Sequence, residues 1–364
     1  MQEFTILQRA LTLCGLAPAM LIGAGVHRDD LPAGLAAPSY RVVIPVPGAP
    51  KPLPVFPAPA ALSATVGALA RDFGGVVGIS VRSLDWGWQI DANGTRRMPQ
   101  QSVSKLWVAM TVLDARDRGR LTLDDPVALT RENLTVFHQP IAALVVQNGV
   151  YQATVRELLL RAMQQSDNTA NDRLLNLVGG PEAVRTFIRE RGLGDIRFGP
   201  GERLLQAGTA GLSWQPRYSM AGEFQRARAA LPPTVRRAAF DAYVADPVDG
   251  AAPAAIALAL ARLKAGELLS PSSTSFLTTV MSGTRTGKAR LRAAVPLGWT
   301  LAHKTGTGQD LGGRTAGFND IGILTAPDGK AYSIAVMIGE TPRPVRERQQ
   351  LMQAVVASIV ANHR

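Results

Sequence analysis

Residues 299–340, WTLAHKTGTGQDLGGRTAGFNDIGILTAPDGKAYSIAVMIGE, contain three strand-like runs, and a PDG turn separates the last two. Two further strand-like runs, 75–84 and 88–91, lie nearer the N-terminus. Between these two groups the spacing of apolar residues is helical. We therefore expect the α/β class, of the α+β type. One antiparallel sheet would be built from both termini and flanked by helices, with an all-helical lobe inserted at about 103–290.

Helices are expected before, between and after the strand-like runs. Residues 154–157 have the Thr-x-x-Glu spacing of a capping box, and Gly180-Pro181 places proline in a first helical turn. Glycine and proline interrupt residues 195–219, which predicts an irregular loop there. The predicted helices are 61–73, 103–119, one opening after Thr154, one opening at Gly180, 251–265, 271–282 and 345–361.

The composition excludes several classes of protein. The chain has 364 residues, 46% of them hydrophobic and 18% charged, so it can bury a large core and is not disordered throughout. Cys14 is the only cysteine, which excludes a disulfide scaffold. The four histidines show no metal-ligand spacing, so we expect no metal site and no cofactor.

A net charge of +11 raises the question of nucleic acid as a partner. Only six of the 39 basic residues are lysine, and the arginines are spread along the chain without a basic run or an aromatic RNA-binding motif. We interpret the charge as an arginine-rich solvated surface and expect no nucleic-acid partner.

The N-terminal region has the pattern of an exported protein. Residues 10–26 form an uncharged apolar run after Arg9, too short and too rich in glycine and proline for a comfortable membrane span. We therefore predict a signal peptide at 1–26, with an uncleaved apolar anchor as the alternative. Closely spaced prolines predict a stiff linker at 27–61, followed by a catalytic domain at 62–364. The expected location is periplasmic or secreted, with no stable membrane insertion after processing.

Three short motifs carry the candidate chemistry. The first is Ser102-Val103-Ser104-Lys105, where the i, i+3 spacing places Ser102 and Lys105 on one helix face. A serine hydroxyl needs a nearby proton acceptor to become a nucleophile, and a lysine of lowered pKa can serve. Alone, this pattern is better explained by a helix start with a solvated lysine.

The second and third motifs supply polar groups for binding and proton transfer. Ser166-Asp167-Asn168 offers a hydroxyl and a side-chain amide, although these residue types also favour helix N-caps. Lys304-Thr305-Gly306 lies on a predicted strand, where a peptide-like substrate can lie along the edge and Lys304 can attract a carboxylate.

The three motifs occur in the order that marks class A β-lactamases and penicillin-binding proteins. From about Leu62 to the C-terminus the chain resembles a class A serine β-lactamase. The agreement extends to SVSKLWVAM, GRLTLDDPV, TVRELLLRAMQQSDNTAND and VPLGWTLAHKTGTG. Asp172 stands where most members of the family have asparagine; a branch that contains extended-spectrum enzymes has aspartate there.

The resemblance implies a role for each matching residue. Ser102 would be the nucleophile that is acylated, Lys105 would activate it or relay protons, and Ser166 would protonate the departing nitrogen with help from Lys304. Asn168 would bind the substrate's side-chain amide, and the backbone N–H groups of Ser102 and Thr307 would form the oxyanion hole. The substrate-binding strand would contain Lys304, Thr305, Gly306 and Thr307. Arg290 falls where some members place a carboxylate-binding arginine, and Arg314 competes for that role.

The residue that would activate the deacylating water is Glu202, because the family has its glutamate 36 residues after the serine of the second motif. Its surroundings depart from the family pattern. Gln206 replaces an asparagine that helps to hold the water, and Pro200 replaces an arginine that pins the loop. About thirty extra residues, near 232–257, also separate this loop from Lys304.

We therefore expect a monomeric serine hydrolase that hydrolyses the amide of small-molecule β-lactams. One alternative is a D-alanyl-D-alanine peptidase or esterase with the same acylation machinery. Another is a β-lactam-binding or sensing protein, or a penicillin-binding protein, that acylates but deacylates slowly. A GxSxG hydrolase is disfavoured because that motif is absent from the sequence.

Overall fold

A computed structural model describes residues 56–364. The predicted signal peptide at 1–26, and the predicted linker as far as residue 55, lie outside the described residues. No helix in the described part of the chain is long and apolar enough to cross a membrane.

The central sheet takes its strands from both ends of the described chain. Its order is β2-β1-β10-β9-β7, with β8 paired to β9, and every pairing is antiparallel. This arrangement confirms the fold class predicted from the sequence. The strands are β1 Val76–Ser83, β2 Gln89–Ala92, β7 Thr300–Thr307, β8 Asp310–Leu311, β9 Arg314–Thr325 and β10 Ala331–Thr341.

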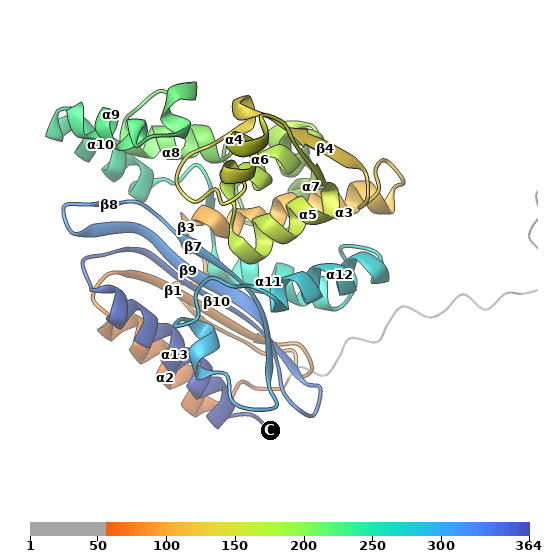
Figure 1. Cartoon of the computed structure of the whole chain (residues 1–364). Helices are drawn as coiled ribbons and strands as arrows, with labels where there is room; N and C mark the ends of the chain where they lie inside the picture. The colour runs from red at the N-terminus through yellow and green to blue at the C-terminus, as the bar shows by residue number, and fades with distance from the viewer. Residues whose placement is uncertain (1–55) are drawn as a thin grey trace, which may run out of the picture. The chain divides into compact units, whose positions relative to one another are not determined.

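Helices cover both faces of this sheet (Figure 1). The first and last helices, α2 (Ala60–Asp72) and α13 (Val345–Ala361), lie together on one face and share a buried apolar core with it. On the other face α11 (Pro253–Lys264) packs against β1, β9 and β10 and belongs to the core of the inserted lobe. Removal of this apolar area from water on both faces is the main stabilising term of such a layered fold.

The inserted lobe is largely helical and surrounds α3, in which every residue from Lys105 to Ala115 is buried. Two small antiparallel ladders, β3 with β6 and β4 with β5, also occur here, and the helical spacing did not predict them. The helices are α3 Lys105–Asp117, α4 Ala142–Asn148, α5 Val155–Leu160, α6 Asn168–Leu177, α7 Gly180–Glu190, α8 Glu202–Ala210, α9 Glu223–Ala230, α10 Pro233–Ala245, α11 and α12 Pro271–Ser282; the short strands are β3 Met98–Pro99, β4 Pro126–Leu129, β5 Tyr151–Thr154 and β6 Gly250–Ala251.

The prediction of an irregular loop over 195–219 was wrong, because helix α8 lies within it. The helix starts after Gly201, whose φ of 94° favours glycine. Its first N–H groups are satisfied by Asp172, whose carboxylate accepts from the backbone N of Glu202 at 3.0 Å and of Arg203 at 3.3 Å. The N-terminal cap comes from a side chain thirty residues away, so local sequence could not show it.

The capping box predicted at 154–157 is half formed. Thr154 accepts from the backbone N of Glu157 at 3.2 Å and caps α5, as predicted. The Glu157 carboxylate, however, binds Tyr151 and Arg161 instead of reaching back to the cap residue. A hydrogen bond from Tyr151 and an ion pair with Arg161, both local in the sequence, therefore replace the reciprocal half of the motif.

Candidate active site

The first motif forms a short 3₁₀ turn, Gln101–Ser104, that leads directly into α3. Gln101, just before Ser102, has a φ of 53°, a conformation that non-glycine residues rarely adopt. Such strain persists only where surrounding contacts hold it, and it gathers at functional sites. Lys105 points back over this turn, with its Nζ 2.8 Å from the Oγ of Ser102.

Lys105 is 1% exposed, and three acceptors surround its ammonium. Besides Ser102, it donates to the Oδ1 of Asn168 at 2.9 Å and forms a buried ion pair with Glu202. An ammonium has three N–H bonds, so these partners use all of them. As a cation, Lys105 is therefore a donor to Ser102. It becomes a proton acceptor only after it passes a proton on, and Glu202 is the carboxylate in contact with it.

Glu202 is held from both sides at the start of α8. Its backbone N donates to Asp172, and the Nε2 of Gln206 donates to its Oε2 at 3.3 Å. Burial and the neighbouring Glu202 charge raise the pKa of Asp172 to about 6. Pro200 stands where the family pattern has an arginine that holds this loop. Here Asp172 holds the start of α8 through its hydrogen bonds to the backbone.

A hydrogen-bonded network joins Gln206 to Gln101, the strained residue before Ser102. The Nε2 of Gln206 lies 3.0 Å from the Oε1 of Gln101, and the Nε2 of Gln101 donates to the Tyr243 hydroxyl at 2.6 Å. Asp249 accepts from the Tyr243 hydroxyl at 2.9 Å and from the backbone N of Gln101 at 2.8 Å. Since Tyr243 belongs to α10, the extra segment contributes directly to the support of the site.

The second motif places Ser166 opposite Lys304. Ser166 has a φ of 61° after a π-helical turn, and Lys304, on β7, donates to its Oγ at 2.9 Å. Lys304 is fully buried, and that burial, together with the charge of Lys105, lowers its pKa well below the usual lysine value. Asp167, between Ser166 and Asn168, caps α6 by accepting from the backbone N of Ala170. The motif therefore provides both the expected helix cap and two groups at the site.

The third motif lies on β7, close to the Gln101–Ser104 turn. A Cβ at Gly306 would lie 2.3 Å from the carbonyl oxygen of Gln100, so only glycine allows this close approach. The hydroxyls of Thr305 and Thr286 are 2.7 Å apart. Thr307 accepts from Arg290, which leaves its own hydroxyl proton available to a ligand.

The structure separates the two competing arginines. Arg290 is 8% exposed and lines the cleft, where its guanidinium donates to Thr307 at 2.5 Å and to the carbonyl oxygens of Gly306 and Asn319. Its burial lowers its pKa to about 10. Arg314 does not line the cleft, and it pairs with Asp241 and Glu340.

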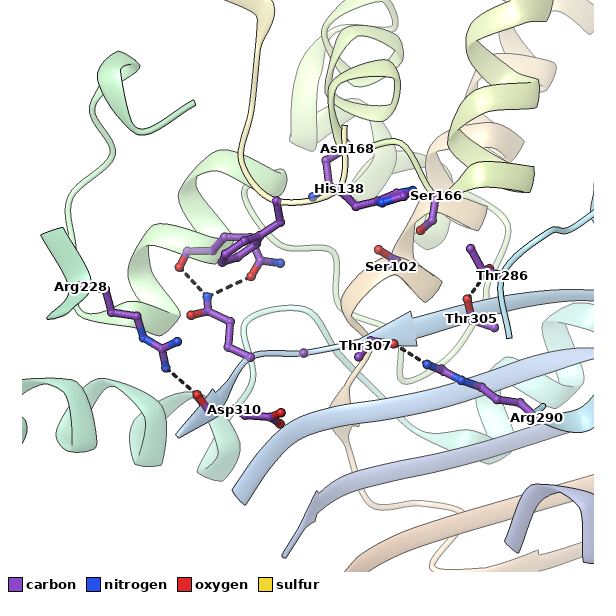
Figure 2. A pocket seen from close by; sticks show the side chains of 14 residues that line it. Ser102, His138, Ser166, Asn168, Arg228, Thr286, Arg290, Thr305, Thr307 and Asp310 are labelled. Atoms are coloured by element: carbon purple, nitrogen blue, oxygen red, sulfur yellow. Dashed lines mark hydrogen bonds between the residues drawn. The ribbon is translucent and has the colours of Figure 1, made fainter. Parts of the chain in front are cut away.

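These groups surround a cleft of about 550 Å³, with Ser102 near its middle (Figure 2). The two lysines and the glutamate do not line the cleft themselves. Each contacts a residue that does: Lys105 contacts Ser102, Lys304 contacts Ser166, and Glu202 contacts Gln206. Several other residues of the wall, among them Phe137, His138, Arg228 and Thr286, lie outside the three motifs and could not be predicted from them. The cleft is lined by Ser102, Phe137, His138, Ser166, Asn168, Gln206, Arg228, Thr286, Arg290, Thr305, Thr307, Gly308, Gln309 and Asp310.

Comparison with known proteins agrees with this geometry. A β-lactamase enzyme family model matches residues 61–363, so the chain belongs to that family. It is similar to the extended-spectrum β-lactamase PER-1 of Pseudomonas aeruginosa, at 28% identity over 77% of this chain and 80% of the relative. A crystal structure of a β-lactamase from Chitinophaga pinensis is 29% identical, covers 83% of this chain and 99% of its own, and has a TM-score of 0.68.

A structure described as an ancestral class A β-lactamase is also similar, with 29% identity, a TM-score of 0.64, and coverage of 82% of this chain and 99% of its own. Together, the family match and the fold confirm the class A resemblance. The order of the motifs Ser102 to Lys105, Ser166 to Asn168 and Lys304 to Gly306 agrees with that family.

Proposed function

We propose that this protein hydrolyses the amide bond of β-lactams through an acyl-Ser102 intermediate, and that Glu202 activates the water that releases the acyl group. The observation that carries the proposal is the position of Lys105. Its ammonium contacts the Oγ of Ser102 and the carboxylate of Glu202 at once, in a buried site beside the cleft. These contacts support a mechanism in which one base acts on Ser102 and another acts on water.

In the acylation step, the Oγ of Ser102 attacks the lactam carbonyl carbon and its proton passes to the Lys105–Glu202 pair. The backbone N–H groups of Ser102 and Thr307 stabilise the developing oxyanion. The C–N bond then breaks, and the lactam nitrogen takes a proton from the Oγ of Ser166. Lys304, which donates to that oxygen at 2.9 Å, stabilises the resulting charge. Ser166 then regains a proton from the Lys105–Glu202 pair, which leaves Glu202 ionised before deacylation.

In the deacylation step, Glu202 removes a proton from a water molecule while the water oxygen attacks the ester carbonyl carbon. The bond to the Oγ of Ser102 breaks, and the serine regains its proton from the Lys105–Glu202 pair. Gln206 supports this step because its Nε2 donates to Glu202. It takes the position at which the family pattern has asparagine, one helical turn after the glutamate.

We assign the two ends of a bound β-lactam to opposite sides of Ser102. The hydroxyls of Thr305 and Thr307, with the Arg290 guanidinium behind Thr307, would bind the ring carboxylate of a β-lactam. Asn168, which lines the cleft while its Oδ1 accepts from Lys105, would bind the side-chain amide.

The test is turnover of a chromogenic cephalosporin by the purified protein and by S102A. We expect sustained hydrolysis by the wild type and none by S102A. Absence of turnover at any pH, or cleavage of D-alanyl-D-alanine peptides in its place, would contradict the proposal. A stable stoichiometric adduct lasting hours would instead assign the chain to the β-lactam-binding proteins.

We also propose that the protein acts as an exported monomer, in the periplasm or outside the cell. The apolar run at 10–26 and the proline-rich stretch that follows support export. Intact mass of the protein recovered from the periplasm should show cleavage near residue 26, and light scattering should give one chain per particle. An uncleaved, membrane-bound chain would contradict export.

A further inference from the structure

A second positive charge faces the cleft from α9, the helix that precedes the extra segment. Arg228, on α9, lines the cleft, and Figure 2 shows it at the opposite end from Arg290, with Ser102 between them. The roles described above do not use this side chain. Its position at the far end of the cleft raises the question of which ligand it faces.

The guanidinium of Arg228 has no carboxylate partner among residues 56–364: no Asp or Glu oxygen lies within 4.0 Å of its nitrogens. It donates to the backbone carbonyl of Asp310 at 2.9 Å, which uses one of its five N–H bonds. Arg226, on the same helix, pairs with Glu223 and does not line the cleft. Arg228 is half-buried, and this burial lowers its pKa. An arginine side chain nevertheless stays protonated in proteins.

Aromatic packing fixes α9 against the cleft wall. Phe224, one turn before Arg228, is 1% exposed, and its ring meets that of Phe137 edge-on with 4.9 Å between centroids. Phe137 itself lines the cleft. Because the buried ring of Phe224 anchors the helix, Arg228 is presented on a fixed element, which lowers the entropic cost of binding.

The charges around Arg228 favour an anion. Arg236 adds positive charge beside it, and the one carboxylate that lines this end of the described cleft belongs to Asp310. That carboxylate is exposed and lies beyond ion-pair distance, while its own backbone carbonyl takes the hydrogen bond. A partly desolvated cation with free donors binds carboxylates well, and arginine can do so through two parallel hydrogen bonds.

We propose that Arg228 forms a subsite for an anionic group, such as a carboxylate, at the distal end of the acyl side chain of a β-lactam. This inference rests on the proposed function. The ring carboxylate and the acyl side chain of a bicyclic β-lactam project to opposite sides of the reacting carbonyl. With the ring carboxylate at Thr307 and Arg290, the acyl side chain extends past Asn168 toward Arg228.

The experiment uses two cephalosporins with the same nucleus, whose oxyimino substituent ends in a carboxylate in one and in a methyl group in the other. The variant R228Q removes the charge but keeps an N–H donor for the Asp310 carbonyl. We expect R228Q to lower kcat/KM for the carboxylate compound about five- to tenfold, chiefly through KM, with less than about a twofold change for the methyl compound. R226Q, the matched control, should change neither.

The pattern of loss across the two compounds decides whether Arg228 forms this subsite. An equal loss with both compounds would show that Arg228 only supports the cleft wall, and no loss with either would show that there is no subsite. Hydrolysis of neither compound by the wild-type protein would refute the proposed function itself. Selective loss in R228Q that disappears at high salt would agree with an ionic contact.

Discussion

The hydrogen-bonded network around Gln101 should matter for both stability and turnover. Substitution Y243F removes one hydroxyl and keeps the buried ring, which packs with Leu205, Phe240 and Ala316. That hydroxyl accepts from the Nε2 of Gln101 at 2.6 Å and donates to Asp249 at 2.9 Å. The second bond is charge-assisted when Asp249 is ionised, because its acceptor is a carboxylate.

The magnitude follows from the two lost bonds. A hydrogen bond to a charged group contributes about 1.5–3 kcal/mol and a neutral one about 1 kcal/mol, so Y243F should lower the free energy of unfolding by about 2–4 kcal/mol. Because Gln101 also holds Gln206, which donates to Glu202, deacylation should slow as well. We expect a fall in kcat of about tenfold or more, since loss of about 1.4 kcal/mol of transition-state stabilisation gives a factor of ten.

Urea unfolding near pH 7 and steady-state kinetics test both parts. The control is Y151F, which also removes a hydroxyl bonded to a carboxylate, that of Glu157, but at a half-buried site away from the cleft. It should cost about 1 kcal/mol or less and leave kcat unchanged. Loss of less than about 0.5 kcal/mol in Y243F, with unchanged kcat, would show that the Tyr243 hydroxyl does not support the site.

Three further predictions concern the site and its pH dependence. K304A removes the donor to Ser166, so stopped-flow acylation should slow about a hundredfold or more; unchanged acylation would argue against its role. G306A places a Cβ 2.3 Å from the Gln100 carbonyl oxygen, so the free energy of unfolding should fall by about 1–3 kcal/mol with loss of turnover, and a fully active variant would contradict the close approach. Burial raises the pKa of Asp249 from 3.8 to about 6, so the folded state binds the extra proton and stability is lost as pH rises from about 4 to 6. The side chain of D249N does not titrate. The free energy of unfolding of the wild type relative to D249N should therefore fall by on the order of 2 kcal/mol across that range. A difference in the free energy of unfolding that does not change with pH would contradict the raised pKa of Asp249.

The sheet and the three motifs could be predicted because each depends on local pattern. The strands at 299–340 show continuous apolar runs bounded by turns, and the Ser102–Lys105 spacing brings both side chains together within one helical turn. The structure places Lys105 against Ser102 and Lys304 against Ser166. These contacts agree with the roles that the resemblance implied.

The rest could not be predicted because its partners are far apart in the chain. Gln101 meets Tyr243 and Asp249, more than 140 residues later, and α8 is capped by Asp172 across thirty residues. No local pattern specifies such pairings, since polar side chains in a loop-rich segment satisfy many arrangements.

The choice between the two arginines also depended on tertiary structure. Arg290 turns into the cleft over the ring of Phe318, whereas Arg314 is engaged by Asp241 and Glu340. Their positions relative to the third motif gave no means of separating these two environments.

We propose that one buried carboxylate, Glu202, activates the water that releases the acyl group from Ser102. Time-resolved intact mass spectrometry with a penicillin tests this directly on the wild type and E202Q, with E182Q as a control carboxylate on the surface of α7. We predict that E202Q accumulates a stoichiometric acyl adduct, with deacylation slowed about a hundredfold or more, while the wild type and E182Q return to the free mass. Clearance of the adduct by E202Q at the wild-type rate would contradict the account.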